Sequence, residues 1–306
     1  MEPTCYTQAS KDANWRAAMT EEINALLKNH TWSLVHPSPS QHVVGCKWVF
    51  RIKRNPDGSV ERYKARLVAK GFHQQHGIDY GETYSPVIKP ATIRTVLCVA
   101  VSRGWSLRQL DVKNAFLHGY LQEDVYMTQP PGFVDSSRPS YVCKLHKALY
   151  GLKQAPRAWF QRMSSFLLSI GFHLSKADSS LFIYQHGLYV IFFLLYVDDI
   201  VVTGSSDRLL QSFIAALGRG FDIKDLGPLH YFLGLQVTPN SNGLHINQLK
   251  YAHDILKKHD LLHSQPVSTP LSAKTVLTTH DGDLLANPTV FREMVGSLQY
   301  LTIYTS

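Results

Sequence analysis

The sequence predicts an α+β fold, because strand and helix patterns alternate irregularly instead of forming regular strand–helix repeats. An amphipathic helix pattern at residues 12–28 and a hairpin pattern at residues 48–69 open the chain. Two adjacent carboxylates interrupt an apolar run at residues 188–202. With 306 residues and 44% hydrophobic content, the chain is long enough to bury one large core or two smaller ones.

The first helix and hairpin occupy the N-terminal part of the chain. In residues 12–28 apolar side chains recur every three to four positions, the period of a helix with one buried face. A Pro- and Ser-rich stretch at residues 36–40 then indicates a linker. Alternating side chains at residues 48–52 and 63–69 flank an Asn-Pro-Asp-Gly turn, which predicts a β-hairpin.

The returning strand of this hairpin carries a row of cations at even positions. In an extended strand, period-two geometry places these side chains on one face. One interpretation is a solvated edge strand, because Lys and Arg commonly protect exposed edges. The other is a surface that holds a triphosphate or a nucleic-acid backbone. The cations are Arg62, Lys64, Arg66 and Lys70.

The remaining elements follow from the same patterns. Helices are expected at residues 90–101, after Pro156, at residues 206–217 and at residues 248–259, the last capped by Asn247. Strands are expected at residues 107–112, 140–145, 231–237 and 243–246, the last two forming a hairpin.

The most informative segment is Tyr196-Val197-Asp198-Asp199. Burying a carboxylate without a partner is costly, so two in an apolar run need a metal, an ion partner or water. A hairpin of residues 189–196 and 200–203 would place both aspartates at its tip, where they could hold a hard cation such as Mg²⁺. The alternative is an ordinary turn, since Asp favours turns.

A third carboxylate, Asp111, lies near the end of the predicted strand 107–112. If this strand lies beside the Asp198–Asp199 hairpin, carboxylates from two distant segments converge. Such a site suits phosphoryl transfer with two metal ions, in which the protein supplies positioning and charge neutralisation.

Charge and composition narrow the class of protein. The net charge of +8 and the pI of about 9.2 suit a polyanionic partner. The cysteines are far apart and form no Cys-x-x-Cys pair, which favours reduced thiols over a zinc site or disulfides. We expect an intracellular, cytoplasmic protein without a membrane partner, because no signal-peptide pattern and no run of about 20 apolar residues occurs. The cysteines are Cys5, Cys46, Cys98 and Cys143.

Five ordered motifs give the chain a specific resemblance. They are YKARLVAKG at residues 63–71, LDVKNAFL at 110–117, LYGLKQAPR at 149–157, YVDD at 196–199 and YFLG at 231–234. The chain resembles the reverse transcriptase of Ty/copia-type long-terminal-repeat retrotransposons, from WRAAM at residues 15–19 to VGSLQYL at residues 295–301. Within an active element of this kind, a virus-like particle is the expected location.

The resemblance implies a role for each site residue. Asp111, Asp198 and Asp199 would be catalytic and would hold two Mg²⁺ ions, with Mn²⁺ as an alternative. The ring of Phe116 would exclude a ribose 2′-hydroxyl, although Phe116 taken alone reads as an ordinary core residue. The other expected nucleotide-binding groups are the side chains of Lys64, Arg66 and Lys70, the backbone amides of Asn114 and Ala115, and the residues Tyr150, Gly151 and Lys224. For Lys224 the alternative is an ordinary surface lysine. The expected primer grip is Phe232, Leu233 and Gly234, which composition alone describes simply as a strand.

The resemblance also implies a right-hand polymerase fold with fingers, a palm built on an antiparallel sheet with the catalytic hairpin, and a partial thumb. The expected boundaries are 1–40 for the N-terminal helix and linker, 41–105 and 126–149 for the fingers, 106–125 and 150–242 for the palm with its primer grip, and 243–306 for the partial thumb or connection. Family members continue into an RNase H domain where this chain stops, and no second acidic cluster is present, so we expect no template degradation.

The leading hypothesis is an RNA-directed DNA polymerase that uses a primer, an RNA or DNA template and deoxynucleoside triphosphates. One alternative is a catalytically silent retrotransposon remnant that only binds nucleic acid through its basic surface. Another is a metal-dependent nuclease that uses the same aspartates. Primer extension separates these three hypotheses, because neither binding nor cleavage adds nucleotides.

Overall fold

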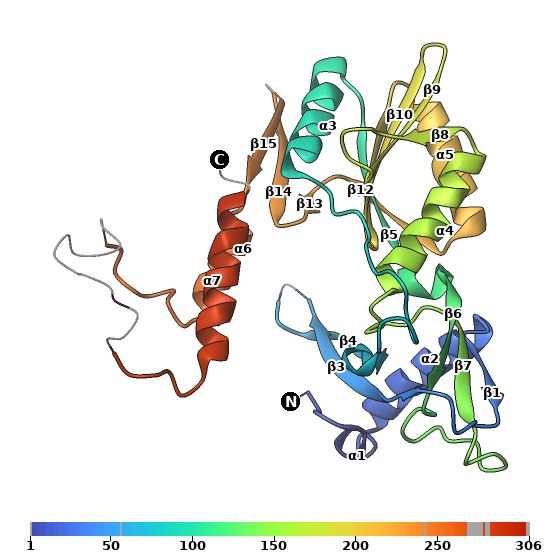
Figure 1. The fold of residues 1–306 in the computed structure, drawn as a ribbon. Helices are drawn as coiled ribbons and strands as arrows, with labels where there is room; N and C mark the ends of the chain where they lie inside the picture. Colours follow the sequence, from blue (N-terminus) through green and yellow to red (C-terminus); the bar gives the residue numbers. More distant parts are fainter. Residues whose placement is uncertain (1, 56, 242, 268–277, 279–281, 304–306) are drawn as a thin grey trace.

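The computed structural model describes residues 2–55, 57–241, 243–267, 278 and 282–303. Within this part, the chain forms seven α-helices and four β-sheets (Figure 1), and the predicted α+β class is confirmed. Most predicted elements occur where the sequence placed them, with ends shifted by one to three residues.

A six-stranded sheet forms the centre of the largest layer. Its strands, in spatial order, are β12 (Ile223–Pro228), β5 (Leu107–Val112), β11 (Asp199–Gly204), β10 (Tyr189–Tyr196), β9 (Leu181–His186) and β8 (Phe172–Leu174). All of its neighbouring strands are antiparallel. Two helices, α4 (Ala155–Ser169) and α5 (Asp207–Gly220), cover one face, while α3 (Pro90–Arg103) packs on the other (Figure 1).

The sequence of β11 explains why both faces of this sheet are covered. Ile200 and Val202 contribute to the core beneath α4 and α5, whereas Val201 contributes to the core beneath α3. A strand buried on both faces reads as a continuous apolar run instead of an alternating one. Polar residues within such a run therefore stand out, as Asp198 and Asp199 do.

A second layer joins the predicted hairpin to the N-terminal helices. Its elements are α1 (Tyr6–Ala9), α2 (Ala13–Lys28), β3 (Cys46–Arg54), β4 (Val60–Ala69) and a four-stranded sheet of β1 (Trp32–Val35), β7 (Val142–Lys147), β6 (Tyr120–Met127) and β2 (Val43–Val44). The side chain of Asp12 caps α2 by accepting a hydrogen bond from the Asn14 N–H at 2.7 Å. The apolar face of α2 packs on the β3–β4 hairpin and fixes it in place.

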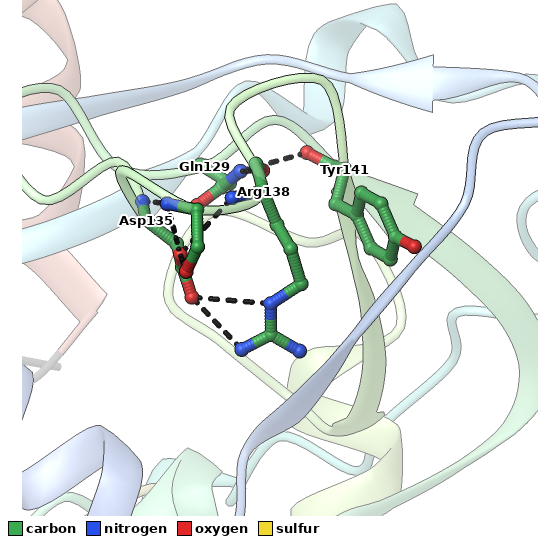
Figure 2. Close-up of polar contacts among 5 residues, drawn as sticks. Gln129, Asp135, Arg138 and Tyr141 are labelled. Atoms are coloured by element: carbon green, nitrogen blue, oxygen red, sulfur yellow. Dashed lines mark hydrogen bonds and ion pairs between the residues drawn. The ribbon is translucent and has the colours of Figure 1, made fainter.

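The loop between β6 and β7 is ordered by its own polar contacts (Figure 2). The amide of Gln129 donates hydrogen bonds to the carbonyls of Arg138 and Tyr141, at 2.8 and 2.9 Å. Asp135 accepts hydrogen bonds from Ser137 and pairs with Arg138 at 2.8 Å, which lowers the pKa of Asp135 to about 2. These contacts hold β7 at Val142–Lys147, two residues beyond the predicted strand 140–145.

The predicted single strand 231–237 is wrong. The chain forms two strands, β13 (Tyr231–Phe232) and β14 (Leu235–Asn240), joined by a turn in which Leu233 and Gly234 have φ of 48° and 80°. A left-handed pair of residues reverses the chain, which an extended pattern does not reveal. The predicted partner is confirmed as β15 (Gly243–Asn247), followed by α6 (Leu249–Lys258) and α7 (Pro288–Ile303).

Candidate active site

The three predicted carboxylates converge at one end of the central sheet. Asp111 in β5 and Asp199 in β11 are direct register partners. Such partners place their Cβ atoms about 5 Å apart on the same face. Asp198 lies in the two-residue turn between β10 and β11, and its carbonyl accepts a hydrogen bond from the Val112 N–H at 2.9 Å. The structure thus brings together the two segments that the sequence left separate.

The turn that carries Asp198 is strained. Val197, its first residue, has φ of 52°, a conformation that favours glycine and that β-branched side chains rarely adopt. Strain of this kind costs about 1–3 kcal/mol and persists where surrounding contacts fix the backbone. Here the indole of Trp159, in α4, donates a hydrogen bond to the Val197 carbonyl at 2.6 Å.

The carboxylates share a partly buried environment that penalises their charge. Burial raises the pKa of Asp111, and the nearby Asp198 raises it further, against the lowering effect of Lys64, Lys224 and Lys113. Burial also raises the pKa of Asp199 to about 6, with added repulsion from Asp198 and Asp111. A bound cation would relieve this penalty.

The donor set fits a hard cation only in part. Among the described residues, no group of three or more His, Cys, Asp or Glu side chains is arranged so that it could hold a metal ion. Asp111 and Asp198 nevertheless line a common cleft and offer carboxylate oxygens, whereas Asp199 stands outside its lining. Mg²⁺ is typically bound by one or two carboxylates together with water and substrate phosphates, so these two residues suffice as the protein's share.

Both walls of the cleft carry side chains of both charge signs. One wall comes from β5, the turn at Asp198 and β12, and the other from α2 and β4. The described residues that line it are Ala18, Glu21, Glu22, Ala25, Arg62, Tyr63, Lys64, Ala65, Arg66, Asp111, Val112, Lys113, Asn114, Asp198, Lys224 and Leu226. Burial lowers the pKa of Lys64, and the neighbouring cations Arg66 and Arg62 lower it further.

Two predicted lysines have different positions relative to this cleft. Lys224 in β12 is the register partner of Asp111 on the side opposite Asp199, and it lines the cleft. Lys70 follows the end of β4 and lies outside the lining, with its side chain beside Gly45. The Lys70 N–H still donates to the Gly45 carbonyl at 2.7 Å, which continues the pairing of the hairpin by one step, and a role of Lys70 in holding the triphosphate stays a prediction.

An aromatic group adjoins the basic strand. The rings of Phe116 and Tyr150 meet edge to face with centroids 4.8 Å apart, and the guanidinium of Arg66 lies 4.2 Å from the centre of the Tyr150 ring. The backbone of β4 fixes this arrangement, because the Ala69 N–H donates to the Tyr150 carbonyl at 2.8 Å. Gly151 has φ of 90°, and a Cβ there would lie 2.2 Å from the Ala69 carbonyl oxygen, so only glycine fits.

The segment from Asp111 to Phe116 turns sharply after β5. Asn114 has φ of 52°, and the chain then enters a short 3-10 helix, η2 (Ala115–His118). Asn114 lines the cleft and Ala115 is buried, while Phe116 lies outside the lining and packs against both neighbouring cores.

The predicted primer-grip residues lie apart from this cleft. Phe232 is buried in the core beneath α3, and Leu233 and Gly234 form the β13–β14 turn. The hydroxyl of Tyr300 in α7 donates to the Leu233 carbonyl at 2.9 Å. The structure places this turn against α7 and does not bring it into the cleft lining.

Sequence reasoning missed two residues of the site. Glu22 lies on the side of α2 opposite its apolar residues, and the structure places it in the cleft lining. Trp159 lies in α4, and its indole N–H supports the turn that carries Asp198. A buried indole N–H nearly always needs an acceptor, which is the signal that sequence alone offered.

Comparisons with known proteins agree with the motifs. A family model described as reverse transcriptase (RNA-dependent DNA polymerase) matches residues 29–273. The chain is 54% identical over 301 residues to the retrovirus-related Pol polyprotein from transposon RE2 of Arabidopsis thaliana, covering 98% of the chain and 21% of the relative. It is 41% identical over 300 residues to the corresponding polyprotein from transposon TNT 1-94 of Nicotiana tabacum, covering 94% of the chain and 22% of the relative. The chain therefore spans about a fifth of the length of these relatives. No helix in the described part of the chain combines the length and the apolar character needed to cross a membrane.

Proposed function

Because this chain belongs to the reverse transcriptase family, as its copia-type motifs predicted, we propose that it is an RNA-directed DNA polymerase domain. It would add deoxynucleotides to a primer 3′-hydroxyl on an RNA or DNA template. In this proposal the central sheet with Asp111 and Asp198 is the palm, and the β3–β4 hairpin belongs to the fingers.

A single observation carries the proposal. Asp111 and Asp198 line one wall of a cleft whose other wall presents Lys64 and Arg66. A nucleoside triphosphate with bound metal ions has complementary charges. Its metal ions would face the carboxylates, and its anionic phosphate oxygens would face the two cations. Neither a general nucleic-acid surface nor an ordinary Asp-Asp turn requires carboxylates and cations to face each other in this way.

Asp111 and Asp198 would hold Mg²⁺, with Asp199 assisting from the neighbouring strand position. When bound, the metal would supply activation of the primer oxygen and stabilisation of the leaving pyrophosphate. Lys64 and Arg66 would bind the β- and γ-phosphates as fixed cations.

The remaining residues would position the nucleotide. Asn114 and Ala115 would offer backbone N–H groups to the triphosphate where the chain turns after β5. Phe116, held by Tyr150, would form the side of the sugar pocket and exclude a 2′-hydroxyl. Lys224, beside Asp111, would be placed to neutralise or protonate the leaving pyrophosphate.

One observation favours a second candidate, a silent domain that only binds nucleic acid. In the described residues the acidic side chains form no group of three arranged for a metal ion. An oligo(dT)–poly(rA) extension assay with Mg²⁺ decides between the two candidates. Extension that disappears in Asp198→Asn supports the polymerase, whereas salt-sensitive binding without extension supports the silent domain. Loss of labelled template without extension would instead indicate a nuclease.

A further inference from the structure

Glu22 is a partly buried carboxylate at the cleft for which the proposed chemistry has no use. It projects from α2 and lines the cleft together with Arg62, Lys64 and Arg66 of β4. Acidic side chains are unexpected on the wall that would receive the triphosphate, because they repel it. Their presence there needs a physical reason.

The position of Glu22 is fixed by the backbone of β4. Its Oε1 accepts a hydrogen bond from the Leu67 N–H at 3.2 Å. Leu67 is paired with Trp48 of β3 on the other side of the strand, so Glu22 caps the outer edge of a two-stranded sheet. The carboxylate is therefore held beside the cations of β4 and does not swing freely in solvent.

The surroundings of Glu22 shift its pKa in opposite directions. Burial raises the pKa of Glu22, while the Leu67 N–H and the cations Arg66 and Lys64 favour its ionised form. The negative charge of Glu22 in turn raises the pKa of Lys64, against the larger lowering effects of burial and the neighbouring cations. Glu22 is thus coupled electrostatically to the two cations that the proposed function assigns to the triphosphate.

We propose that Glu22 is the resident counter-ion of the cationic wall and weakens binding of phosphate anions to Lys64 and Arg66. The inference rests on the proposed function. In a basic protein with a net charge of +8, an uncompensated cluster of cations would hold any polyanion. A fixed carboxylate lowers that affinity, so that a triphosphate accompanied by metal ions is favoured and free pyrophosphate leaves more readily.

The test compares Glu22→Gln with wild type, because the amide oxygen still accepts from the Leu67 N–H while the charge is removed. Binding of inorganic pyrophosphate to the metal-free protein is measured by calorimetry at low salt, and KM for dTTP is measured on oligo(dT)–poly(rA). Glu22→Gln is expected to tighten pyrophosphate binding and lower KM by about three- to tenfold, the effect of one nearby unit charge in a water-like dielectric.

The matched control is Asp254→Asn, which removes the same charge from the exposed surface of α6, away from the cleft. Equal effects of the two variants, or unchanged pyrophosphate binding in Glu22→Gln, would overturn the proposal and leave Glu22 as an edge cap. Glu22→Ala tests that cap separately, through a lower melting temperature. Failure of wild type to extend a primer would refute the polymerase, while the pyrophosphate measurement still reports on Glu22.

Discussion

The indole of Trp159 donates a hydrogen bond to the backbone carbonyl of Val197 at 2.6 Å. Trp159 is 1% exposed, so this donor has no access to bulk water, and Val197 occupies a left-handed conformation that its branched side chain disfavours. One contact therefore satisfies a buried polar group and holds the strained turn that presents Asp198.

Replacing Trp159 with Phe should lower the extension rate by more than the accompanying loss of stability accounts for. The variant loses the indole hydrogen bond and part of the side-chain volume, at a cost of about 1–3 kcal/mol in the free energy of unfolding. Without the indole donor to the Val197 carbonyl, the turn should also misplace Asp198 and lower the extension rate by at least about tenfold. Urea unfolding and single-turnover extension give the two quantities.

Trp48→Phe is the matched control for this prediction. Trp48 is also buried, and its indole donates to the Pro131 carbonyl at 3.0 Å, far from the aspartates in the chain. The two variants should lose similar stability, but Trp48→Phe should retain most of its extension rate. Equal losses of activity would show that Trp159 acts only through the fold.

Asp199 should make stability depend on pH in an identifiable range. Burial and its acidic neighbours raise its pKa to about 6 in the folded protein, against about 4 in an unfolded chain. The folded state therefore binds this proton more tightly, and its contribution to stability falls as pH rises from about 4 to about 6. In Asp199→Asn that portion of the pH dependence should disappear. The free energy of unfolding, measured by urea titration across this range, tests it, and parallel curves for the two proteins would refute it.

Asp198→Asn should abolish synthesis without weakening the fold. Loss of a metal ligand is expected to cost about 4 kcal/mol or more in transition-state stabilisation, roughly a thousandfold in rate. Stability should stay the same or rise, because Asp198 adds repulsion to both Asp111 and Asp199. A variant that keeps more than about a tenth of the wild-type rate would rule out the assigned role.

The sequence predicted those parts of the fold that local periodicity determines. The helix at residues 13–28, the β3–β4 hairpin and the strand carrying Asp111 all have regular spacing of apolar side chains, and all were placed within a few residues. The convergence of Asp111 with the hairpin was predicted only on the condition that the strand 107–112 lies beside the hairpin, and the pairing of β5 with β11 meets that condition. The β13–β14 turn was not predictable, since Leu233 adopts its left-handed conformation without a glycine at that position.

The parts that escaped prediction depend on contacts between distant segments. Helical periodicity separates the apolar side of α2 from the side that bears Glu22, but it does not reveal that β4 runs alongside the polar side. Lys224 was no different from a surface lysine until β12 was seen to pair with β5. Such residues join the site through tertiary packing, which a single sequence does not encode in local spacing.

Binding to a primer–template duplex should weaken steeply as salt rises. The net charge of +8 and the cations of β4 favour contacts with phosphates, and each contact contributes close to one unit to the slope of log affinity against log salt concentration. Fluorescence anisotropy with a labelled duplex, from low to physiological ionic strength, measures the slope. A flat response would argue against a nucleic-acid substrate.

The sharpest prediction concerns selection of the sugar by Phe116. Its ring lies five residues beyond Asp111 and is held edge to face against Tyr150, whose other contact is the Arg66 guanidinium. A ring fixed in this way would reject a ribose by steric overlap, with no hydrogen bond involved. Phe116→Val should therefore lower the ratio of kcat/KM for dGTP over GTP by at least about tenfold, equivalent to about 1.4 kcal/mol of lost discrimination.

Two comparisons separate this role from packing. Phe116 contributes to both neighbouring cores, so Phe116→Val should also lower the free energy of unfolding by about 1–2 kcal/mol. Tyr150→Phe keeps the supporting ring and should leave the sugar ratio unchanged, whereas Tyr150→Leu removes the edge-to-face contact and should lower the ratio in the same direction as Phe116→Val. If Phe116→Val lowers stability and overall activity but leaves the dGTP-to-GTP ratio intact, Phe116 is a core residue and selection against ribose lies elsewhere.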